Sequence, residues 1–361
     1  MKRVTARQLM PGMVAAEDIF SLNNQLLIPR GTVLTDTAIT ILEMYNIISI
    51  RVEDAQTPVD DAEDSAPDLT RPYSERVKKS PEFQRFKKEY DSQINHLQAT
   101  LTSSLEQKKH FDPDELLDGT IELLGVPGTA SSVFDMLHCM REYDDSTFAH
   151  SINVALICNV AARWLDMSEE DIRTATACGL FHDIGKLHIP KKILNKPAKL
   201  STDEYNVIKT HPLAGYQLLQ EQGASVSICN AALMHHERCD GSGYPLGLKS
   251  EQIDPFAKLV SIADVYDAMT ASRVYRGPLC PFTVIEIFER EGLQQYEPRY
   301  IMTFLENVVN TYILNRCRLS NGQEGDIIYI NRDKLSRPMV QCGHEYVNLA
   351  ERMNLKIECL L

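Results

Sequence analysis

The sequence predicts a mainly α-helical protein, with a small mixed α/β module before a large helical domain and a short β-rich extension after it. Three observations lead to this fold class. Helix signals dominate residues 111–316, which contain few strand-like alternations. Alternating strand patterns are confined to residues 1–52 and 317–361. The length of 361 residues, 43% of them hydrophobic, suits roughly two to three packed units.

The strand patterns lie at the two ends of the chain. In residues 1–52, the segments GMVAAEDIF and QLLIPRGTVL contain strand-like runs joined by Asn-Asn and Arg-Gly turns. Thr35 then caps a predicted helix, TAITILEMYN, and the strand IISIRVE follows. In residues 317–361, three segments have strand character: GDIIYI, PMVQC and LKIECL.

Two segments connect the first module to the helical domain. Residues 53–72 are acidic and contain proline, so we expect a solvated linker. Residues 73–110 are predicted to form a long connecting helix, with a stripe of apolar side chains spaced by three and four: Phe83, Phe86, Tyr90, Ile94 and Leu97. Two interpretations of the stripe stay open: packing on the same domain, and packing on a second copy in a homodimer.

Helix starts are marked within residues 111–316. Ser168 and Ser201 each precede an acid by three residues, the spacing of a capping box. Pro212 and Pro281 stand where first helical turns would begin. These signals predict successive helices through the whole segment.

The charge and composition exclude several classes of protein. A net charge of −13 argues against a duplex nucleic-acid binder, which needs an excess of cations. Seven acids lie in residues 53–68, so the remainder is only mildly acidic and can accept a small anionic ligand. The nine cysteines form no C-x-x-C pair, which argues against a zinc knuckle and for reduced thiols.

Membrane insertion and secretion are not expected either. No stretch approaches the about 20 apolar residues of a membrane span. The N-terminal sequence MKRVTARQLMPGM has no apolar core or cleavage site of a secretory signal. We therefore expect a soluble, cytoplasmic protein.

The side chains with the clearest chemical potential are histidines and aspartates in the predicted helices. They are His150, His182, Asp183, His211, His235, His236 and Asp264. A single such histidine is most often a structural residue, but five imidazoles and two carboxylates on successive helices suit a divalent transition metal. A carboxylate such as Asp183 can bridge two ions, and two ions about 3.5–4 Å apart can activate water and bind a phosphoryl group.

Three cations could serve an anionic substrate. Lys186 follows His182 by four residues and shares its face if the helix continues. Arg273 and Arg276 follow Asp264 on the chain. Spacing alone leaves two interpretations for each cation, phosphate binding and exposure to solvent.

Several motifs in sequence order resemble the HD-GYP family of cyclic di-GMP phosphodiesterases, within the HD superfamily of metal-dependent phosphohydrolases. The motifs are HSINVA, HDIGKLHIPKKILNKPAKLS, KTHPLAGYQLL, HHERCDGSGYPLGL and IADVYDAMTASRVYR. The resemblance spans roughly residues 111–316. It implies a helical HD-type bundle that holds a centre of iron or manganese ions and hydrolyses cyclic di-GMP to pGpG and onward to GMP.

The resemblance also implies roles for individual residues. All seven histidines and aspartates named above would bind metal, Asp183 as the bridge, and a metal-activated hydroxide would attack phosphorus. His182, Asp183 and Lys186 would form the catalytic set. Lys186, Arg273 and Arg276 would contact the substrate phosphates. The signature loop near the guanine pocket, which could also bind a signalling partner, would consist of Asp240, Gly243, Tyr244 and Pro245.

One departure from the family pattern concerns the number of ions. Members with three metals have a Glu four residues before the first ligating His, and here that position is Ser146. We therefore expect two divalent ions and pGpG as the main product. Three alternatives remain: a phosphodiesterase for 3',3'-cyclic GMP-AMP, a weakly active sensor of cyclic dinucleotides, and a dimetal oxygenase, which the three cations disfavour.

Overall fold

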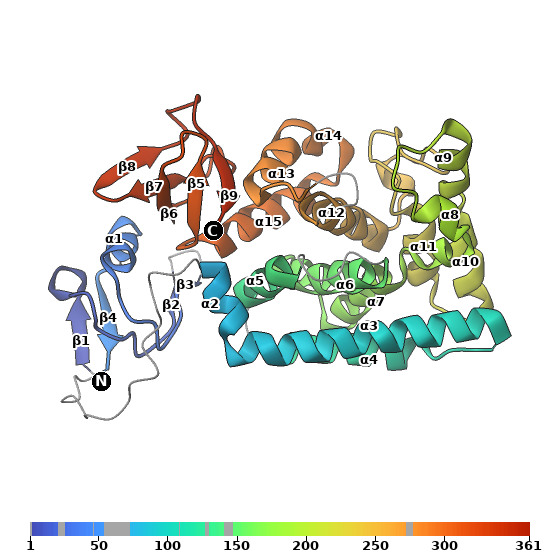
Figure 1. The fold of residues 1–361 in the computed structure, drawn as a ribbon, viewed down its shortest axis with the longest axis horizontal. Coiled ribbons are helices and arrows are strands. Elements are labelled where there is room, and N and C mark those ends of the chain that lie inside the picture. The colour runs from blue at the N-terminus through green and yellow to red at the C-terminus, as the bar shows by residue number, and fades with distance from the viewer. Residues whose placement is uncertain are drawn as a thin grey trace. The chain divides into compact units, whose positions relative to one another are not determined.

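The described part of the chain divides into two compact units. The computed structural model describes residues 2–20, 26–45, 47–53, 73–107, 109–126, 130–140, 147–271 and 277–361. One unit combines Met1–Arg76 with Val308–Leu361, and the other is Val77–Asn307 (Figure 1). The two terminal segments, predicted as separate modules, thus belong to one unit. The domain limits at residues 52, 72, 110 and 316 stay predictions, and almost all of the acidic linker lies outside the described residues.

In its described residues, the N-terminal part of the first unit contains two small antiparallel sheets and the α-helix α1 (Asp36–Met44). Strand β1 (Lys2–Thr5) pairs with β4 (Ser49–Val52), and β2 (Ile19–Phe20) pairs with β3 (Leu26–Ile28). Helix α1 begins where the sequence predicts, because the Thr35 side chain accepts a hydrogen bond from the Ala38 amide at 3.1 Å.

The C-terminal part of the first unit is a five-stranded antiparallel sheet in the order β8-β7-β6-β5-β9. Its strands are β5 (Arg316–Leu319), β6 (Glu324–Tyr329), β7 (Met339–Cys342), β8 (Glu345–Asn348) and β9 (Ile357–Leu360). The predicted strands correspond to β6, β7 and β9. The sequence patterns predict no strand at β5 or β8.

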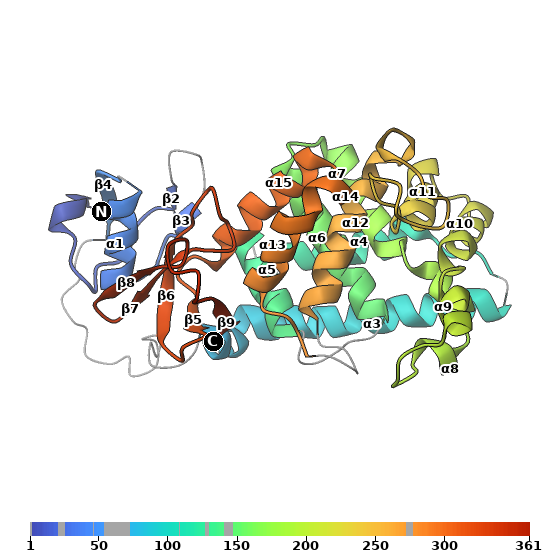
Figure 2. The same ribbon diagram turned by 90° about the horizontal axis from the view of Figure 1, so that it is seen from above.

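The second unit is a bundle of helices (Figure 1; Figure 2). From residue 73 onward, the α-helices are α2 (Tyr73–Lys79), α3 (Pro81–Gln107), α4 (Pro113–Glu122), α5 (Ala130–Met140), α6 (Thr147–Trp164), α7 (Glu169–Phe181), α8 (Lys191–Leu194), α9 (Thr202–Ile208), α10 (His211–Glu221), α11 (Val226–Met234), α12 (Pro255–Thr270), α13 (Pro281–Ile287), α14 (Leu293–Gln295) and α15 (Pro298–Val308). The mainly α fold predicted from the sequence is confirmed.

Helix α6 is the central helix of this bundle. Its residues are mostly apolar, and every residue from Ser151 to Ala162, including the polar ones, is buried. It contacts α7 and α12 and also α3, α4 and α5. A helix buried on all sides gives the residues on it fixed positions, which matters for the site described below.

The predicted long helix is two helices that meet at Ser80. The Ser80 hydroxyl accepts a hydrogen bond from the Phe83 amide at 3.1 Å, and Pro81 occupies the first position of α3. The apolar stripe of α3 is at most 5% exposed and packs within its own unit, against α4, α5 and α6. Of the two interpretations, packing on the same domain therefore describes the stripe.

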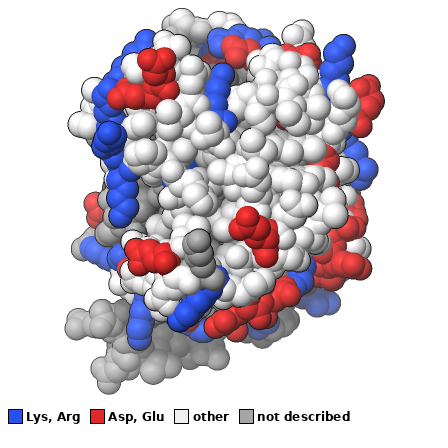
Figure 3. Space-filling view, turned by 90° about the vertical axis from the view of Figure 1, so that its right-hand side faces the viewer, with Lys and Arg blue, Asp and Glu red and all other residues white. Residues whose placement is uncertain are grey.

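The outer surface at the α8–α11 end of the bundle carries side chains of both charges. Figure 3 shows Lys and Arg interspersed with Asp and Glu around a broad area that has neither.

Among the described helices, none combines the length and the hydrophobicity that a membrane span requires.

Candidate metal centre

The structure brings all seven predicted metal ligands together in the second unit. Most of them lie at helix ends: His150 in the first turn of α6, the His182-Asp183 pair after α7, His211 at the start of α10 and the His235-His236 pair after α11. Asp264 lies within α12. The ligand atoms form two groups, each with its atoms within 4.8 Å of one another: Asp183, His211, His235 and His236 in the first group, and His150, His182 and Asp264 in the second.

Three histidine rings are oriented by the backbone of their own segments. The Nδ1 atom of His182 lies 2.7 Å from the Gly179 carbonyl oxygen, and that of His211 lies 2.7 Å from the Ile208 oxygen. His235 Nδ1 lies 2.9 Å from the carbonyl oxygen of Ala232. Because a carbonyl only accepts, each Nδ1 carries the proton and each Nε2 keeps its lone pair for a metal ion.

Asp183 lies between the two groups and presents one oxygen to each. Its Oδ1 atom is 3.3 Å from His211 Nε2 and 3.6 Å from His235 Nε2, both in the first group. Its Oδ2 atom is 3.3 Å from His182 Nε2 and 3.7 Å from His150 Nε2, both in the second group. This is the arrangement that a bridging carboxylate requires.

The donor atoms fit a divalent cation. Among the described residues, His182 Nε2 and Asp183 Oδ1 are buried side-chain atoms without a hydrogen-bond partner. Such an atom costs about 1–3 kcal/mol when it is left unpaired in a protein interior. A cation would satisfy both atoms at once, and imidazole with carboxylate is a donor set that suits iron, manganese, zinc and nickel.

The ionisation states also suit metal binding. Burial lowers the pKa of His235 to about 4, and burial together with the neighbouring His235 holds the pKa of His236 well below its usual value. Both rings are therefore neutral at pH 7, as ligands must be. Burial opposes the charge on Asp183, but the Lys186 ammonium group beside it favours the ionised form, and the pKa of this carboxyl is well below its usual range.

His150 shows how strongly the second group attracts a cation. Burial alone would lower the pKa of its ring, but hydrogen bonds with Asp264 and Asp267 outweigh burial and raise this pKa to about 9. His150 Nε2 lies 3.0 Å from Asp264 Oδ1. The carboxylates that favour a proton at this place favour a metal cation there as well.

Lys186 lies beside the candidate metal centre, but its position differs from the one that the helical spacing predicted. Helix α7 ends at Phe181, and a 3-10 turn, Ile184–His188, follows. Lys186 therefore does not share a helical face with His182; its ammonium group instead donates to Asp183 Oδ2. The lysine still lies beside the carboxylate that faces both ligand groups.

Hydrogen bonds to Glu237 hold the predicted signature loop next to the candidate metal centre. This carboxylate is buried, and its two oxygens accept hydrogen bonds from the amides of Leu246 and Leu248 at 2.7 and 2.9 Å. Gly243 packs against the backbone of Glu237 and Arg238. A Cβ atom on Gly243 would stand 2.4 Å from the backbone nitrogen of Arg238. Only glycine fits such a close approach.

The other loop residues occupy different positions. The ring of Tyr244 stacks on His236 with centroids 4.6 Å apart, and Lys209 Nζ lies 5.0 Å above the Tyr244 ring. Asp240 is exposed, and its Oδ1 accepts hydrogen bonds from the amide and the hydroxyl of Ser242. Pro245 is exposed and follows a cis peptide bond. The aromatic member of the loop is thus the one in contact with a candidate ligand.

Three predicted positions lie outside the described residues. They are Ser146, Arg273 and Arg276. The expected contacts of the two arginines with phosphate, and the expectation of two ions that rests on Ser146, stay predictions.

Sequence reasoning assigned no role to Asp267 or Glu237. Asp267 Oδ2 lies 2.7 Å from His150 Nδ1, and the residue follows Asp264 by three positions on the same helix. That spacing puts both carboxylates on one face of α12 and could have indicated Asp267. Glu237 directly follows the His235-His236 pair, but nothing in the spacing reveals that its partners are backbone amides nine and eleven residues later.

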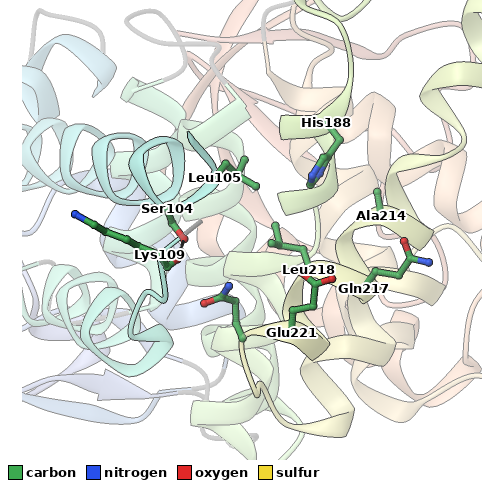
Figure 4. Close-up of a pocket in the computed structure, with 9 residues that line it drawn as sticks. Ser104, Leu105, Lys109, His188, Ala214, Gln217, Leu218 and Glu221 are labelled. Atoms are coloured by element: carbon green, nitrogen blue, oxygen red, sulfur yellow. Dashed lines mark hydrogen bonds between the residues drawn. The ribbon is translucent and has the colours of Figure 1, made fainter. Parts of the chain in front are cut away.

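A pocket of about 480 Å³ lies elsewhere in the second unit, between the end of α3 and α10 (Figure 4). Its polar lining comes from both sides, with Lys109 on one and His188, Gln217 and Glu221 on the other. None of the seven candidate ligands lines it. The pocket is therefore separate from the candidate metal centre.

The comparisons with known proteins agree with this geometry. A family model described as an HD domain matches residues 135–300. A cyclic di-GMP phosphodiesterase of Pseudomonas aeruginosa is 33% identical over 204 residues, which are 56% of this chain and 49% of that protein. The 3'3'-cGAMP-specific phosphodiesterase 1 of Vibrio cholerae is 39% identical over 168 residues, 46% of this chain and 39% of that one. The response regulator RpfG of Xanthomonas campestris, a cyclic di-GMP phosphodiesterase, is 42% identical over 164 residues, 45% and 43% of the two chains.

A solved structure supports the fold. An HDG"Y"P protein from Bdellovibrio bacteriovorus superposes with a TM-score of 0.51 and 15% identity, over 84% of this chain and 97% of the other. The chain spans half or less of the length of the curated relatives named above. The resemblance predicted from the sequence is confirmed: residues 135–300 match an HD domain, and curated relatives that are 33–42% identical are named as cyclic di-GMP phosphodiesterases.

Proposed function

We propose that this chain is a metal-dependent phosphodiesterase that hydrolyses cyclic di-GMP to the linear dinucleotide pGpG and, more slowly, to GMP. The observation that carries the proposal is the position of Asp183, whose two oxygens face two separate groups of ligand atoms. Relatives named as cyclic di-GMP phosphodiesterases support the choice of substrate.

The seven candidate ligands would hold two divalent ions, with iron or manganese as the proposed metals. Asp183, His211, His235 and His236 would hold one ion, and His150, His182 and Asp264, with the second oxygen of Asp183, would hold the other. When bound, such a pair supplies an activated water as nucleophile and neutralises charge on a phosphodiester. The overall reaction forms one bond from phosphorus to the water oxygen and breaks one ester bond, and a ribose hydroxyl leaves with a proton.

The chain's own side chains would bind and orient the substrate. Lys186 lies beside Asp183 with 19% of its side chain exposed, so its ammonium group can contact a phosphate oxygen that enters the centre. Tyr244, stacked on His236, offers a flat ring at the edge of the centre for a nucleobase. Asp240, Gly243 and Pro245 would complete this loop, and we propose Arg273 and Arg276 as further phosphate contacts.

A second substrate, 3',3'-cyclic GMP-AMP, is favoured by one specific observation. A relative that is 39% identical over 168 residues is named as specific for this hybrid dinucleotide. The two substrates have the same two phosphodiester groups and differ in one base, so the same metal centre would serve either. A homodimer that includes residues 73–110 and a signalling partner at the Tyr244 loop also stay proposals.

The test is product analysis by chromatography. Full-length protein, purified without oxygen and loaded with Fe(II) or Mn(II), is incubated with cyclic di-GMP and cyclic GMP-AMP in parallel. Metal-dependent pGpG, absent for D183N and present for the matched surface variant D118N, would support the proposal. Asp118 is an exposed partner of Arg173 and is no candidate ligand. Two bound ions per chain with no turnover of either substrate would overturn it and favour a sensor.

A further inference from the structure

A chain of hydrogen bonds runs from the second ligand group to helix α3. His150 Nδ1 donates to Asp267 Oδ2 at 2.7 Å. The other oxygen of Asp267 accepts from Asn153 Nδ2 at 3.2 Å. The Tyr90 hydroxyl donates to Asn153 Oδ1 at 2.6 Å and lies 3.2 Å from the Ala149 carbonyl oxygen. We call Tyr90, Asn153 and Asp267 the relay.

The relay is buried and internally consistent. Tyr90 and Asp267 are 1% exposed and Asn153 is 6% exposed. The amide oxygen of Asn153 faces a hydroxyl donor and its amide nitrogen faces a carboxylate, so both ends of the side chain have suitable partners. Hydrogen bonds in such a low-dielectric setting are strong, and each one restrains the next.

His150 differs from the other oriented ligands in what holds it. His182, His211 and His235 each donate Nδ1–H to a carbonyl of their own local backbone. His150 donates to a side chain on another helix, α12, and that side chain is in turn bound by Asn153 on α6 and through it by Tyr90 on α3. Helix α3 lies before the residues 135–300 that match the HD domain.

We propose that the relay residues are positioning residues, which hold the His150 ring with Nε2 toward Asp264 and Asp183. In this way the affinity of the second ligand group for its ion depends on the position of α3. In the first ligand group, the rings of His211 and His235 are oriented by backbone carbonyls and do not share this dependence. The inference rests on the proposed function in one respect, that the second group binds an ion.

The expected effect is selective loss of one of two ions. Removing a partner that orients a metal-bound histidine typically weakens metal binding about 10- to 100-fold. For D267N we expect a loss of about this size at one ion and little change at the other. N153A and Y90F lie farther along the relay, so their losses should be smaller, in that order.

Two matched variants control for the removal of a buried polar group. Gln93 lies one turn after Tyr90 on α3 and bonds to the Leu116 carbonyl and to Thr120. Asn159 lies on α6, as Asn153 does, and bonds to Thr176 and Arg163. Neither residue contacts the relay in these bonds, so Q93L and N159A should keep both ions while losing comparable stability.

The experiment measures metal binding and needs no turnover. Full-length wild type and variants are titrated with Mn(II), with free ion followed by electron paramagnetic resonance, and the thermal unfolding of each metal-free protein is recorded. One weakened ion in Y90F, N153A and D267N, with two tight ions in Q93L and N159A, would support the inference. Adding Y90F to D267N should cause no further loss, because the relay is already broken at Asp267.

The outcomes separate this inference from the proposed function. If wild type binds two ions and the relay variants bind them as the controls do, the relay does not position His150, while the phosphodiesterase proposal stands. If Y90F and D267N weaken binding additively, Tyr90 does not act through Asp267 and the inference is wrong. Failure of wild type to bind any ion would overturn both.

Discussion

Gly185 lies so close to His211 that a Cβ atom on the glycine would stand 2.0 Å from the His211 carbonyl oxygen. This contact packs the turn after His182-Asp183 directly against the start of α10, and thereby brings ligands from two segments to one centre.

The first prediction concerns this contact. In G185A the turn and α10 must separate, which should destabilise the protein by about 1–3 kcal/mol and weaken binding of the ion shared by Asp183 and His211. Denaturant unfolding and metal titration would measure the two effects. G125A is the control, because a Cβ there meets nothing within 4 Å. Equal behaviour of both variants would contradict the prediction.

The second prediction concerns Glu237, which accepts hydrogen bonds from two loop amides. In E237Q an NH2 group faces one of these amides, so one hydrogen bond is lost at about 1–3 kcal/mol. The loop that carries Tyr244 should loosen, and KM for the cyclic dinucleotide should rise while the number of bound ions stays the same. Steady-state kinetics with metal analysis would test this. E169Q, at an exposed pair with Arg163, should change neither quantity.

The third prediction uses the stacking of Tyr244 on His236. Y244F keeps the ring and should bind substrate about as well as wild type. Y244L removes the ring, and at about 0.5–1.5 kcal/mol for an aromatic pair its affinity should fall roughly 2- to 13-fold. Equilibrium binding of a non-hydrolysable cyclic dinucleotide would compare them. Equal loss in both variants would assign the effect to the hydroxyl instead of the ring.

The fourth prediction separates the two ligand groups. H150A removes a ligand of the second group only, and H211A one of the first group only, so each variant should keep one tight ion. In D183N an amide replaces the carboxylate that presents one oxygen to each group, so the affinity for both ions should fall. Metal content after dialysis would test this, and one ion retained at full affinity in D183N would exclude a bridging Asp183.

The fifth prediction concerns metal removal. An ion that binds only the folded protein and is present at 100 times its Kd adds about 2.7 kcal/mol to the free energy of unfolding. Chelation should therefore lower Tm, and adding Mn(II) back should restore it. In D183N the chelator should have a much smaller effect, and an unchanged Tm in chelated wild type would contradict the proposed site.

Local sequence patterns predicted where several of the helices begin. Thr35 and Ser201 cap helices as predicted, with Ser201 in a complete capping box, and Pro212 and Pro281 stand in first turns. Such signals act over three or four residues and depend little on the rest of the chain. The same approach failed for Lys186, because the end of α7 at Phe181 replaces the helical spacing by a tighter turn.

The sequence by itself determined which side chains could bind metal, since it contains the seven histidines and aspartates and sets their order along the chain. Only the tertiary structure decided that Asp183 turns one oxygen to each group and that Tyr90 reaches His150 through Asn153 and Asp267. The physical reason is distance along the chain. Tyr90 and Asn153 are 63 positions apart and His150 and Asp267 are 117 apart, and contacts at such separations follow from how helices pack, which no local periodicity encodes.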